Sequence, residues 1–422
     1  MLTLKTNDEY IKILKEELVP ALGCTEPIAL AYAAAKAQQV LGCEVSKVTA
    51  LCSGNMIKNV RCVTIPNSKG MVGVAAAVCL GIFGGDADKE MEVLASVTEE
   101  TRKQAQTFIE NNGCSVEYLD TPVPLHFIIK VWGEGKTAAV HIKNEHTNIT
   151  KIEKDGKIIF EGKSSTNFEP LADRSCLNID DIKTFCDEVD IGEIEQVISK
   201  LVRYNMAIAE EGLTGKYGLD LGNVILNSYP DSVLTKMKSY AAAASEARMC
   251  GCDLPVIINS GSGNQGIASS VPVIVFAQHA GIRGDKLYRC LAFSALLTVY
   301  QKEFIGKLSA FCGAVSASCA SAAAITYMES FDVEKIKYTI ANTLANIPGI
   351  ICDGAKDSCS AKIASSLDAA MMAHFLAMKG KVYDAFSGIL KENAGETISC
   401  VGYIGKEGMR ETDKEIIKIM LQ

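Results

Sequence analysis

The amino-acid sequence predicts an α+β fold in two domains. Residues 1–170 are expected to form an N-terminal α+β domain with a small antiparallel sheet, and residues 171–422 an all-α helical domain. Strand-like alternation is concentrated between residues 115 and 160, whereas helical periodicity dominates after residue 178. A polar segment rich in Gly, Ser, Pro and Asp separates the two patterns at 161–178, as is typical of a domain boundary.

The first residues predict two helices with a turn between them. A capping box at residues 6–9 begins a run with helical spacing that ends at Pro20. Gly23 breaks this helix, and Thr-Glu-Pro at 25–27 fits the first turn of the next one. Cys24 is thus placed at a helix N-terminus, where the dipole would lower the thiol pKa and favour a reactive thiolate. The alternative is a buried structural cysteine in a turn.

Strands and helices alternate through the rest of the N-terminal domain. Strands are predicted at 45–51, 115–119, 125–132, 137–143 and 147–160, the last folded around an Asp155-Gly156 turn, and helices at 72–83 and 89–111. After the first strand, a turn containing Asn55 is followed by Lys58. Backbone N–H groups and a lysine in this arrangement could bind an anion, although a solvated loop fits equally well.

The C-terminal domain shows only helical patterns. Helices are predicted at 179–188, 191–210, 232–250, 266–281, 285–304, 314–330, 333–345, 362–378 and 411–421. Because the loops between them are short, we expect a compact helical bundle.

Composition and charge narrow the class of partner. The net charge is -8, which provides no basic surface for nucleic acid or anionic lipid. No apolar stretch is long enough to span a membrane, so we expect a small-molecule partner. Sixteen cysteines scattered through apolar helices, with no signal peptide, indicate a reduced cytoplasmic protein. A homodimer is compatible with the sequence.

A glycine-rich loop precedes the helix predicted at 266–281. Its residues are Asn259, Ser260, Gly261, Ser262, Gly263, Asn264 and Gln265. Its glycines would let the backbone approach a ligand, and the following helix would present free N–H groups to an anion. A carboxylate suits the loop better than a phosphate, because the Gly-Lys-Ser/Thr ending of a P-loop is missing.

Three cysteines of the C-terminal domain could meet at one point. Cys312 opens an Ala- and Ser-rich helix, and Cys352 and Cys359 lie in Gly- and Asp-rich turns. Thiolates select iron–sulfur clusters, zinc or copper(I), and three ligands leave one metal position open to substrate. The spacing of the second and third cysteines is not diagnostic, and buried apolar cysteines are the alternative.

These motifs together resemble the L-cysteine desulfidase family, which is related to the α chain of iron–sulfur L-serine dehydratases. The resemblance rests on Gly23-Cys24-Thr25-Glu26-Pro27, the loop at 259–266, Cys312-Gly313-Ala314 and Ile351-Cys352-Asp353-Gly354-Ala355-Lys356. It extends over nearly the whole chain, with the dehydratase likeness expected only at about 254–359.

The resemblance implies a PLP-independent β-elimination of L-cysteine to pyruvate, ammonia and hydrogen sulfide. It implies a [4Fe-4S] cluster on Cys312, Cys352 and Cys359, with Cys319 as the substitute third ligand. Cys24 would be the base, with Glu26 and Lys307 as rivals, and Asn55 and Lys58 would reach the substrate from the first domain. L-Serine or another β-substituted amino acid as substrate, a non-catalytic thiol-rich metal-binding protein and a PLP lyase are the alternatives.

Overall fold

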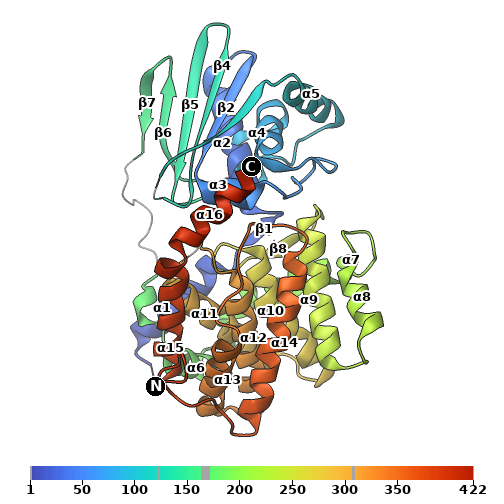
Figure 1. Ribbon diagram of the computed structural model, residues 1–422, viewed down its shortest axis with the longest axis vertical. Helices are drawn as coiled ribbons and strands as arrows, with labels where there is room; N and C mark the ends of the chain where they lie inside the picture. The colour runs from blue at the N-terminus through green and yellow to red at the C-terminus, as the bar shows by residue number, and fades with distance from the viewer. Residues whose placement is uncertain (1, 122, 163–171, 307–308, 422) are drawn as a thin grey trace.

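The protein has two lobes, a sheet lobe and a helical lobe, stacked along its longest axis (Figure 1). The computed structural model describes residues 2–121, 123–162, 172–306 and 309–421, and it confirms the α+β class. Each lobe has its own hydrophobic core. Residues between 28 and 152 form the core of the sheet lobe, and residues 10–18 with residues between 172 and 401 form that of the helical lobe.

A six-stranded mixed sheet organises the sheet lobe. Its strands are β2 (Lys47–Cys52), β3 (Cys114–Tyr118), β4 (His126–Gly133), β5 (Lys136–Lys143), β6 (Ile149–Lys154) and β7 (Lys157–Glu161), in the order β3-β2-β4-β5-β6-β7. Neighbouring strands pair antiparallel as predicted, except β2 and β3. These two are parallel because several helices lie between them in the chain and return it to the same end of the sheet.

Helices pack against this sheet, and the two together enclose the hydrophobic core of the sheet lobe. The helices are α2 (Thr25–Leu41), α3 (Gly54–Val60), α4 (Gly73–Gly84) and α5 (Glu99–Glu110), with the 3-10 turn η1 (Ala87–Glu92). Alternate residues of β4, such as Phe127 and Ile129, are buried in the same core as α2 and α4. The single helix predicted at 89–111 is two elements, η1 and α5, because Thr98 caps a new helix.

The helical lobe confirms the predicted helices and adds others. It contains α1 (Leu4–Glu17), η2 (Arg174–Cys176), α6 (Ile179–Glu188), α7 (Ile191–Gly212), α8 (Leu221–Ser228), α9 (Val233–Met249), α10 (Gly263–His279), α11 (Asp285–Ile305), α12 (Gly313–Ser330), α13 (Val333–Asn346), α14 (Cys359–Met378) and α15 (Ala394–Tyr403). The sequence pattern did not predict α3, α8 or α15. Helix α12 is buried along nearly its whole length, since its Ala and Ser residues let α10, α11, α13 and α14 pack around it.

The chain begins in the helical lobe before it enters the sheet lobe. Tyr10 of α1 packs edge-on against Phe185 of α6, with 5.2 Å between ring centroids. Strand β1 (Pro20–Leu22) then pairs antiparallel with β8 (Pro255–Ile257), which holds the start of α2 beside the glycine-rich loop. The predicted domain boundary at residue 170 lies outside the described residues, so this division stays a prediction.

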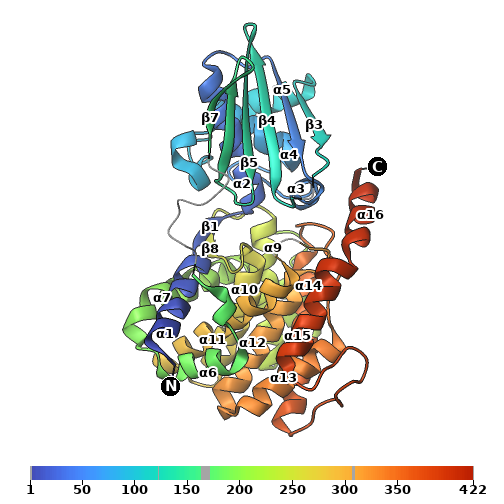
Figure 2. The ribbon, with the colours of Figure 1, turned by 90° about the vertical axis from the view of Figure 1, so that its left-hand side faces the viewer.

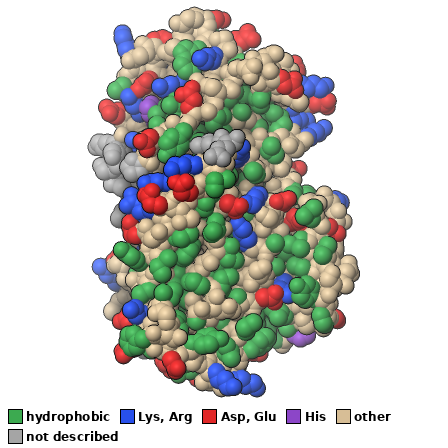
Figure 3. Space-filling model, viewed as in Figure 1, with side chains coloured by type: hydrophobic (Ala, Val, Ile, Leu, Met, Phe, Trp, Pro, Cys, Tyr) green, Lys and Arg blue, Asp and Glu red, His purple; other side chains and the backbone are tan. Residues whose placement is uncertain are grey.

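The last helix joins the lobes again. A π-helical turn, η3 (Ile404–Gly408), leads into α16 (Arg410–Leu421), which leaves the helical lobe and ends beside the sheet lobe (Figure 2). There it packs on α3, where Ile417 lies directly against Gly54. Charged side chains gather where α16 passes between the lobes (Figure 3). Over the ranges given above, no helix has the length and apolar character needed to cross a membrane.

Candidate active site

A cavity of about 1420 Å³ lies between the two lobes. Its walls come from the start of α2, from α3, from the glycine-rich loop, from the N-terminal ends of α12 and α14, and from α16. This volume exceeds that of ordinary ligand pockets, so an amino acid would occupy only part of it. The cavity is lined by every described residue that the sequence predicted for the site, except Asn259, Gly263 and the substitute ligand Cys319.

The three predicted cysteine ligands face this cavity together. Cys312 N donates to Ile350 O at 2.8 Å and Cys352 N to Ala310 O at 2.7 Å, so two backbone bonds hold these cysteines side by side. The hydrogen bond between their thiols lowers the pKa of Cys352 to about 5 and raises that of Cys312. Cys359, the first residue of α14, interacts electrostatically with both.

The fourth cysteine considered as a ligand lies elsewhere. Cys319 is buried in the helical core beside Thr343, does not line the cavity, and has a pKa raised to about 12 by burial. The structure therefore contradicts Cys319 as a substitute ligand. No group of three or more His, Cys, Asp or Glu side chains within the described ranges is already arranged to hold a metal ion.

Lysine side chains surround the cysteines. Lys302 of α11 is almost fully buried, lines the cavity, and interacts with Cys312 and Cys352; burial lowers its pKa to about 8. Lys362 of α14 donates to Ile351 O at 2.9 Å, which ties the cysteine-bearing loop to this helix. The sequence gave a weak signal for Lys302, since a lysine at helical spacing from Leu291 and Thr298 falls on the apolar face of its helix.

Cys24 is placed as predicted, but its expected ionisation is wrong. It is the N-cap residue of α2 and lies in a small apolar cluster with Cys359 and Met249. Burial raises the pKa of Cys24 to about 12, and the nearby Arg248 opposes this shift only in part. The cost of removing a thiolate from water outweighs the helix dipole, so Cys24 is a neutral thiol here.

The rival bases have different positions. Glu26, in the first turn of α2, is half-buried and lines the cavity. Its carboxylate accepts hydrogen bonds from Asn59 Nδ2 at 3.5 Å and from Thr25 Oγ1 at 3.2 Å. Lys307 lies outside the described residues.

The glycine-rich loop is a tight turn that leads directly into α10. Asn259 and Ser262 exchange backbone hydrogen bonds of 3.0 and 3.1 Å, and Ser260 and Gly261 between them have φ values of 49° and 76°. Positive φ at both central positions is typical of a type I′ turn. The helix begins at Gly263 rather than 266, and the Ser262 side chain does not cap it.

Two residues of the loop, Asn259 and Gly263, do not face the cavity and instead pack against other parts of the helical lobe. Asn259 is fully buried and donates to Ala295 O of α11 at 3.1 Å. Gly263 lies under the guanidinium of Arg248, where a Cβ atom would come within 2.2 Å of Nε. Ser260, Gly261, Ser262, Asn264 and Gln265 form the part of the loop that lines the cavity.

The two predicted residues of the sheet lobe reach the cavity from α3. Asn55 lines it, and its Oδ1 atom is buried without a hydrogen-bond partner. Lys58 is almost fully buried and donates to Asp413 Oδ1 of α16 at 2.5 Å. The ammonium group of Lys58 is thus already paired.

Arg248, which the sequence analysis missed, also lines the cavity. It is only 4% exposed and extends from the end of α9. Its Nη1 donates to Asn264 Oδ1 at 3.2 Å and its Nη2 to Gly23 O at 3.0 Å, which links the glycine-rich loop to the start of α2. An arginine within the Ala-rich stretch at 241–249 was the available signal.

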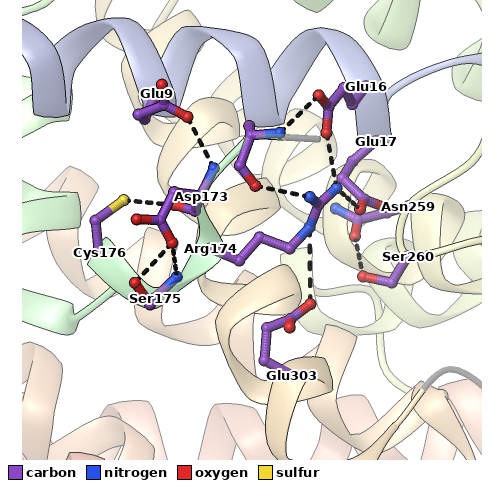
Figure 4. A network of polar contacts seen from close by, with 11 residues as sticks. Glu9, Glu16, Glu17, Asp173, Arg174, Ser175, Cys176, Asn259, Ser260 and Glu303 are labelled. Atoms are coloured by element: carbon purple, nitrogen blue, oxygen red, sulfur yellow. Dashed lines mark hydrogen bonds and ion pairs between the residues drawn. The ribbon is translucent and has the colours of Figure 1, made fainter. Parts of the chain in front are cut away.

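A second arginine closes another part of the cavity. Figure 4 shows Arg174 directed at acidic side chains from two helices, Glu16 and Glu17 of α1 and Glu303 of α11. Its Nη2 donates to Glu17 Oε1 at 2.6 Å and to Glu16 Oε2 at 3.0 Å, and its Nη1 to Ala172 O at 3.1 Å. This arginine ties α1 to η2 and α11.

Comparisons with known protein sequences identify the family of this chain. A sequence model of the family described as serine dehydratase alpha chain matches residues 88–418. The chain belongs to the serine dehydratase alpha chain family. The match extends from the 3-10 turn η1 to α16, well beyond the expected likeness at 254–359, but it does not include α2, β2, α3 or α4 of the sheet lobe.

Relatives of similar length share the whole chain. A UPF0597 protein from Lachnoclostridium phytofermentans is 46% identical over 413 residues, covering 98% of this chain and 99% of the relative. One from Treponema denticola is 46% identical over 423 residues, covering 99% and 98%. Membership of the serine dehydratase alpha chain family indicates a serine-dehydratase-like lyase.

Proposed function

We propose that this member of the serine dehydratase alpha chain family is a PLP-independent lyase that converts L-cysteine to pyruvate, ammonia and hydrogen sulfide. Its cofactor would be a [4Fe-4S] cluster held by Cys312, Cys352 and Cys359. One observation carries the proposal: three thiols from separate elements face one cavity beside the glycine-rich loop.

The donor atoms fit such a cluster. Thiolates are the ligands that iron–sulfur clusters take in proteins, and Cys312 and Cys352 are already in contact. Buried Lys302 supplies positive charge that would offset the thiolates, whereas the nearby Lys362 is already paired with Asp353. When bound, the cluster would supply a Lewis-acidic iron to the leaving sulfur atom.

The residues of the chain would position the substrate and move one proton. The glycine-rich loop would bind the substrate carboxylate at the start of α10. A base would take the Cα proton while the Cα electron pair forms the double bond to Cβ and the Cβ–S bond breaks, releasing sulfide. The resulting aminoacrylate would take up one water and yield pyruvate and ammonia.

Glu26 is the base that the arrangement favours. It presents a carboxylate to the cavity, whereas Cys24 is held as a neutral thiol by burial. This reverses the order expected from the sequence, in which Cys24 came first. Both remain candidates, and their variants distinguish them as described below.

L-Serine is the second candidate substrate, because the matching family is described as serine dehydratase. Anaerobically purified protein should be given each amino acid at equal concentration, and pyruvate and sulfide measured. We expect kcat/KM for L-cysteine to exceed that for L-serine, with equal amounts of pyruvate and sulfide. A higher value with L-serine would replace the proposed substrate, and no pyruvate from either amino acid would contradict a lyase.

A further inference from the structure

Three residues that line the cavity each carry a buried polar atom with no hydrogen-bond partner among the described residues. The atoms are Nε of Arg248, Oε1 of Gln265 and Oδ1 of Asn55, contributed by α9, α10 and α3. A buried donor or acceptor left unpaired destabilises a protein, so such groups require an explanation. A bound ligand would explain all three at once.

Arg248 provides a fixed positive charge. Its Nη atoms are held by Asn264 Oδ1 and Gly23 O, both of which are uncharged. Arg248 is almost fully buried, and among the described residues its side chain contacts the thiol of Cys24 but has no carboxylate partner. Burial of an unpaired guanidinium is unfavourable, so this position is suited to an anion from outside the chain. A carboxylate can accept two hydrogen bonds from such a group.

Two glycines make room for these side chains. A Cβ at position 263 would lie 2.2 Å from Arg248 Nε, and a Cβ at position 313 would lie 2.4 Å from Gln265 Cδ. Gly263 does not line the cavity, so backbone contact with a ligand does not explain it. Its absent side chain instead allows Arg248 to reach the wall. Gly313, next to Cys312, does the same for Gln265.

The remaining two atoms are acceptors rather than donors. Gln265 Oε1 and Asn55 Oδ1 belong to opposite lobes, and neither carries a charge. A primary ammonium group has three N–H donors, and neutral amide oxygens can accept from it. One cationic donor and two neutral acceptors match the two charged groups of an α-amino acid.

We propose that these side chains form the site for the α-carboxylate and α-ammonium groups of the substrate. Arg248 binds the carboxylate, and Gln265 and Asn55 accept hydrogen bonds from the ammonium. The assignment rests on the proposed function for the identity of the substrate. It adds an arginine as the carboxylate anchor and requires both lobes for the binding of one small molecule.

Binding of unreactive ligands tests this site without turnover. L-Alanine carries both groups but has no leaving group, L-alaninamide lacks the carboxylate, and propionate lacks the ammonium. Isothermal titration calorimetry on the anaerobically purified protein should show L-alanine binding more tightly than either analogue. We expect Arg248→Lys to weaken L-alanine binding by about tenfold or more and to leave L-alaninamide binding unchanged. Equal losses for both ligands would mean that Arg248 is only structural.

Gln265→Met tests the ammonium contact in the same way. It should weaken L-alanine and L-alaninamide but not propionate, because only the ammonium contact is lost. Gly263→Ala gives a second test of Arg248, since the added methyl group would displace the guanidinium without touching the ligand. Gly192→Ala is the matched control, because Gly192 also lies in the first turn of a helix, does not line the cavity, and has room for a Cβ, with the Asp190 carboxylate 3.4 Å away. Its L-alanine affinity should stay close to that of the wild type. If Gly263→Ala also binds L-alanine normally, the role of Arg248 is wrong.

The outcomes separate this inference from the proposed function. Normal L-alanine binding with no pyruvate from L-cysteine or L-serine would contradict the lyase but keep the amino-acid site. Pyruvate formation with unaltered L-alanine affinity in the Arg248→Lys and Gln265→Met proteins would contradict the site but keep the lyase. Absence of L-alanine binding to the wild-type protein would overturn the inference directly.

Discussion

Two arginines line the same cavity, the almost fully buried Arg248 and the half-buried Arg174, and their partners differ. Arg174 directs its donors at Glu16, Glu17, Glu303 and a backbone carbonyl (Figure 4). Arg248 has no acidic partner in the described parts of the chain, and one of its nitrogen atoms makes no hydrogen bond. This difference shows that a binding arginine is identified by its unsatisfied donors and not by its burial. A saturated arginine supports the fold, whereas an unsaturated one is available to a ligand.

The two lysines near the thiols, Lys58 and Lys302, also differ in whether they have a carboxylate partner. Lys58 has a carboxylate partner, Asp413, at 2.5 Å. Lys302 interacts only with Cys312 and Cys352 among the described residues. We therefore expect substitutions on the Arg248 side of the cavity to change substrate binding and turnover. Substitutions at Arg174 or at the Lys58 pair should change stability.

The largest effect is expected at the cysteines. Cys352→Ser should remove measurable pyruvate formation, because a hydroxyl is a poor replacement for a thiolate toward iron. Cys319→Ser is the matched control, since Cys319 is buried in the same lobe away from the cavity. A lactate dehydrogenase-coupled assay would follow pyruvate. If Cys352→Ser still forms pyruvate, the three cysteines pack the protein interior and do not hold a cofactor.

A smaller loss of activity is expected when the proposed base, Glu26, is replaced. Glu26→Gln should lower kcat by about 100-fold to 10,000-fold, as is typical of removing a general base, while iron content stays unchanged. Cys24→Ser should lower kcat by less than about tenfold, because a neutral thiol does not take the proton. Steady-state kinetics on both variants would compare them. A larger loss in Cys24→Ser than in Glu26→Gln would restore Cys24 as the base.

Substitution of Arg174 should change the stability of the protein rather than substrate binding. Arg174→Met leaves the buried Glu17 without its partner and should lower the free energy of unfolding by about 3 kcal/mol. The exposed pair Lys414–Glu411 is the control, and Lys414→Met should change stability by less than about 1 kcal/mol. Urea denaturation would measure both. An unchanged stability together with a raised KM would give Arg174 the role that we assign to Arg248.

The smallest effect is expected at the contact between α3 and α16. Asp413→Asn removes the carboxylate that pairs with buried Lys58 and should destabilise the protein by about 2 kcal/mol. The KM for L-cysteine should change by less than about threefold, because Lys58 is not a free anion site. Denaturation and kinetics on one preparation would measure both quantities. A fall in KM of tenfold or more would show that Asp413 competes with the substrate for Lys58.

The sequence predicted the parts of the site that have local signals. The glycine-rich loop, the turn before α2 and the three cysteines are short motifs, and each of these cysteines and the loop's Ser260 line the cavity. Arg248 and Lys302 gave only weak signals, as single charged residues on the apolar faces of their helices, because helical periodicity reports packing rather than binding. The ionisation of Cys24 depended on the cluster with Met249 and Cys359, which only tertiary structure creates.

The path of the chain was also only partly predictable. Helical periodicity predicted α1, although the helix ends at Glu17 rather than at Pro20, but not the lobe to which it belongs. That placement depends on the three-residue pairing of β1 with β8, which is too short to leave an alternating pattern. The parallel pairing of β2 with β3 likewise depends on the helices between them rather than on either strand.

Iron and acid-labile sulfide, measured per chain after anaerobic purification, test the central claim most directly. If Cys312, Cys352 and Cys359 hold a [4Fe-4S] cluster, the wild type and Cys319→Ser should each contain about four of both, and a serine at any of the three positions should remove them. A wild-type protein that contains zinc or no metal would contradict the account, as would full iron content in the Cys359→Ser protein.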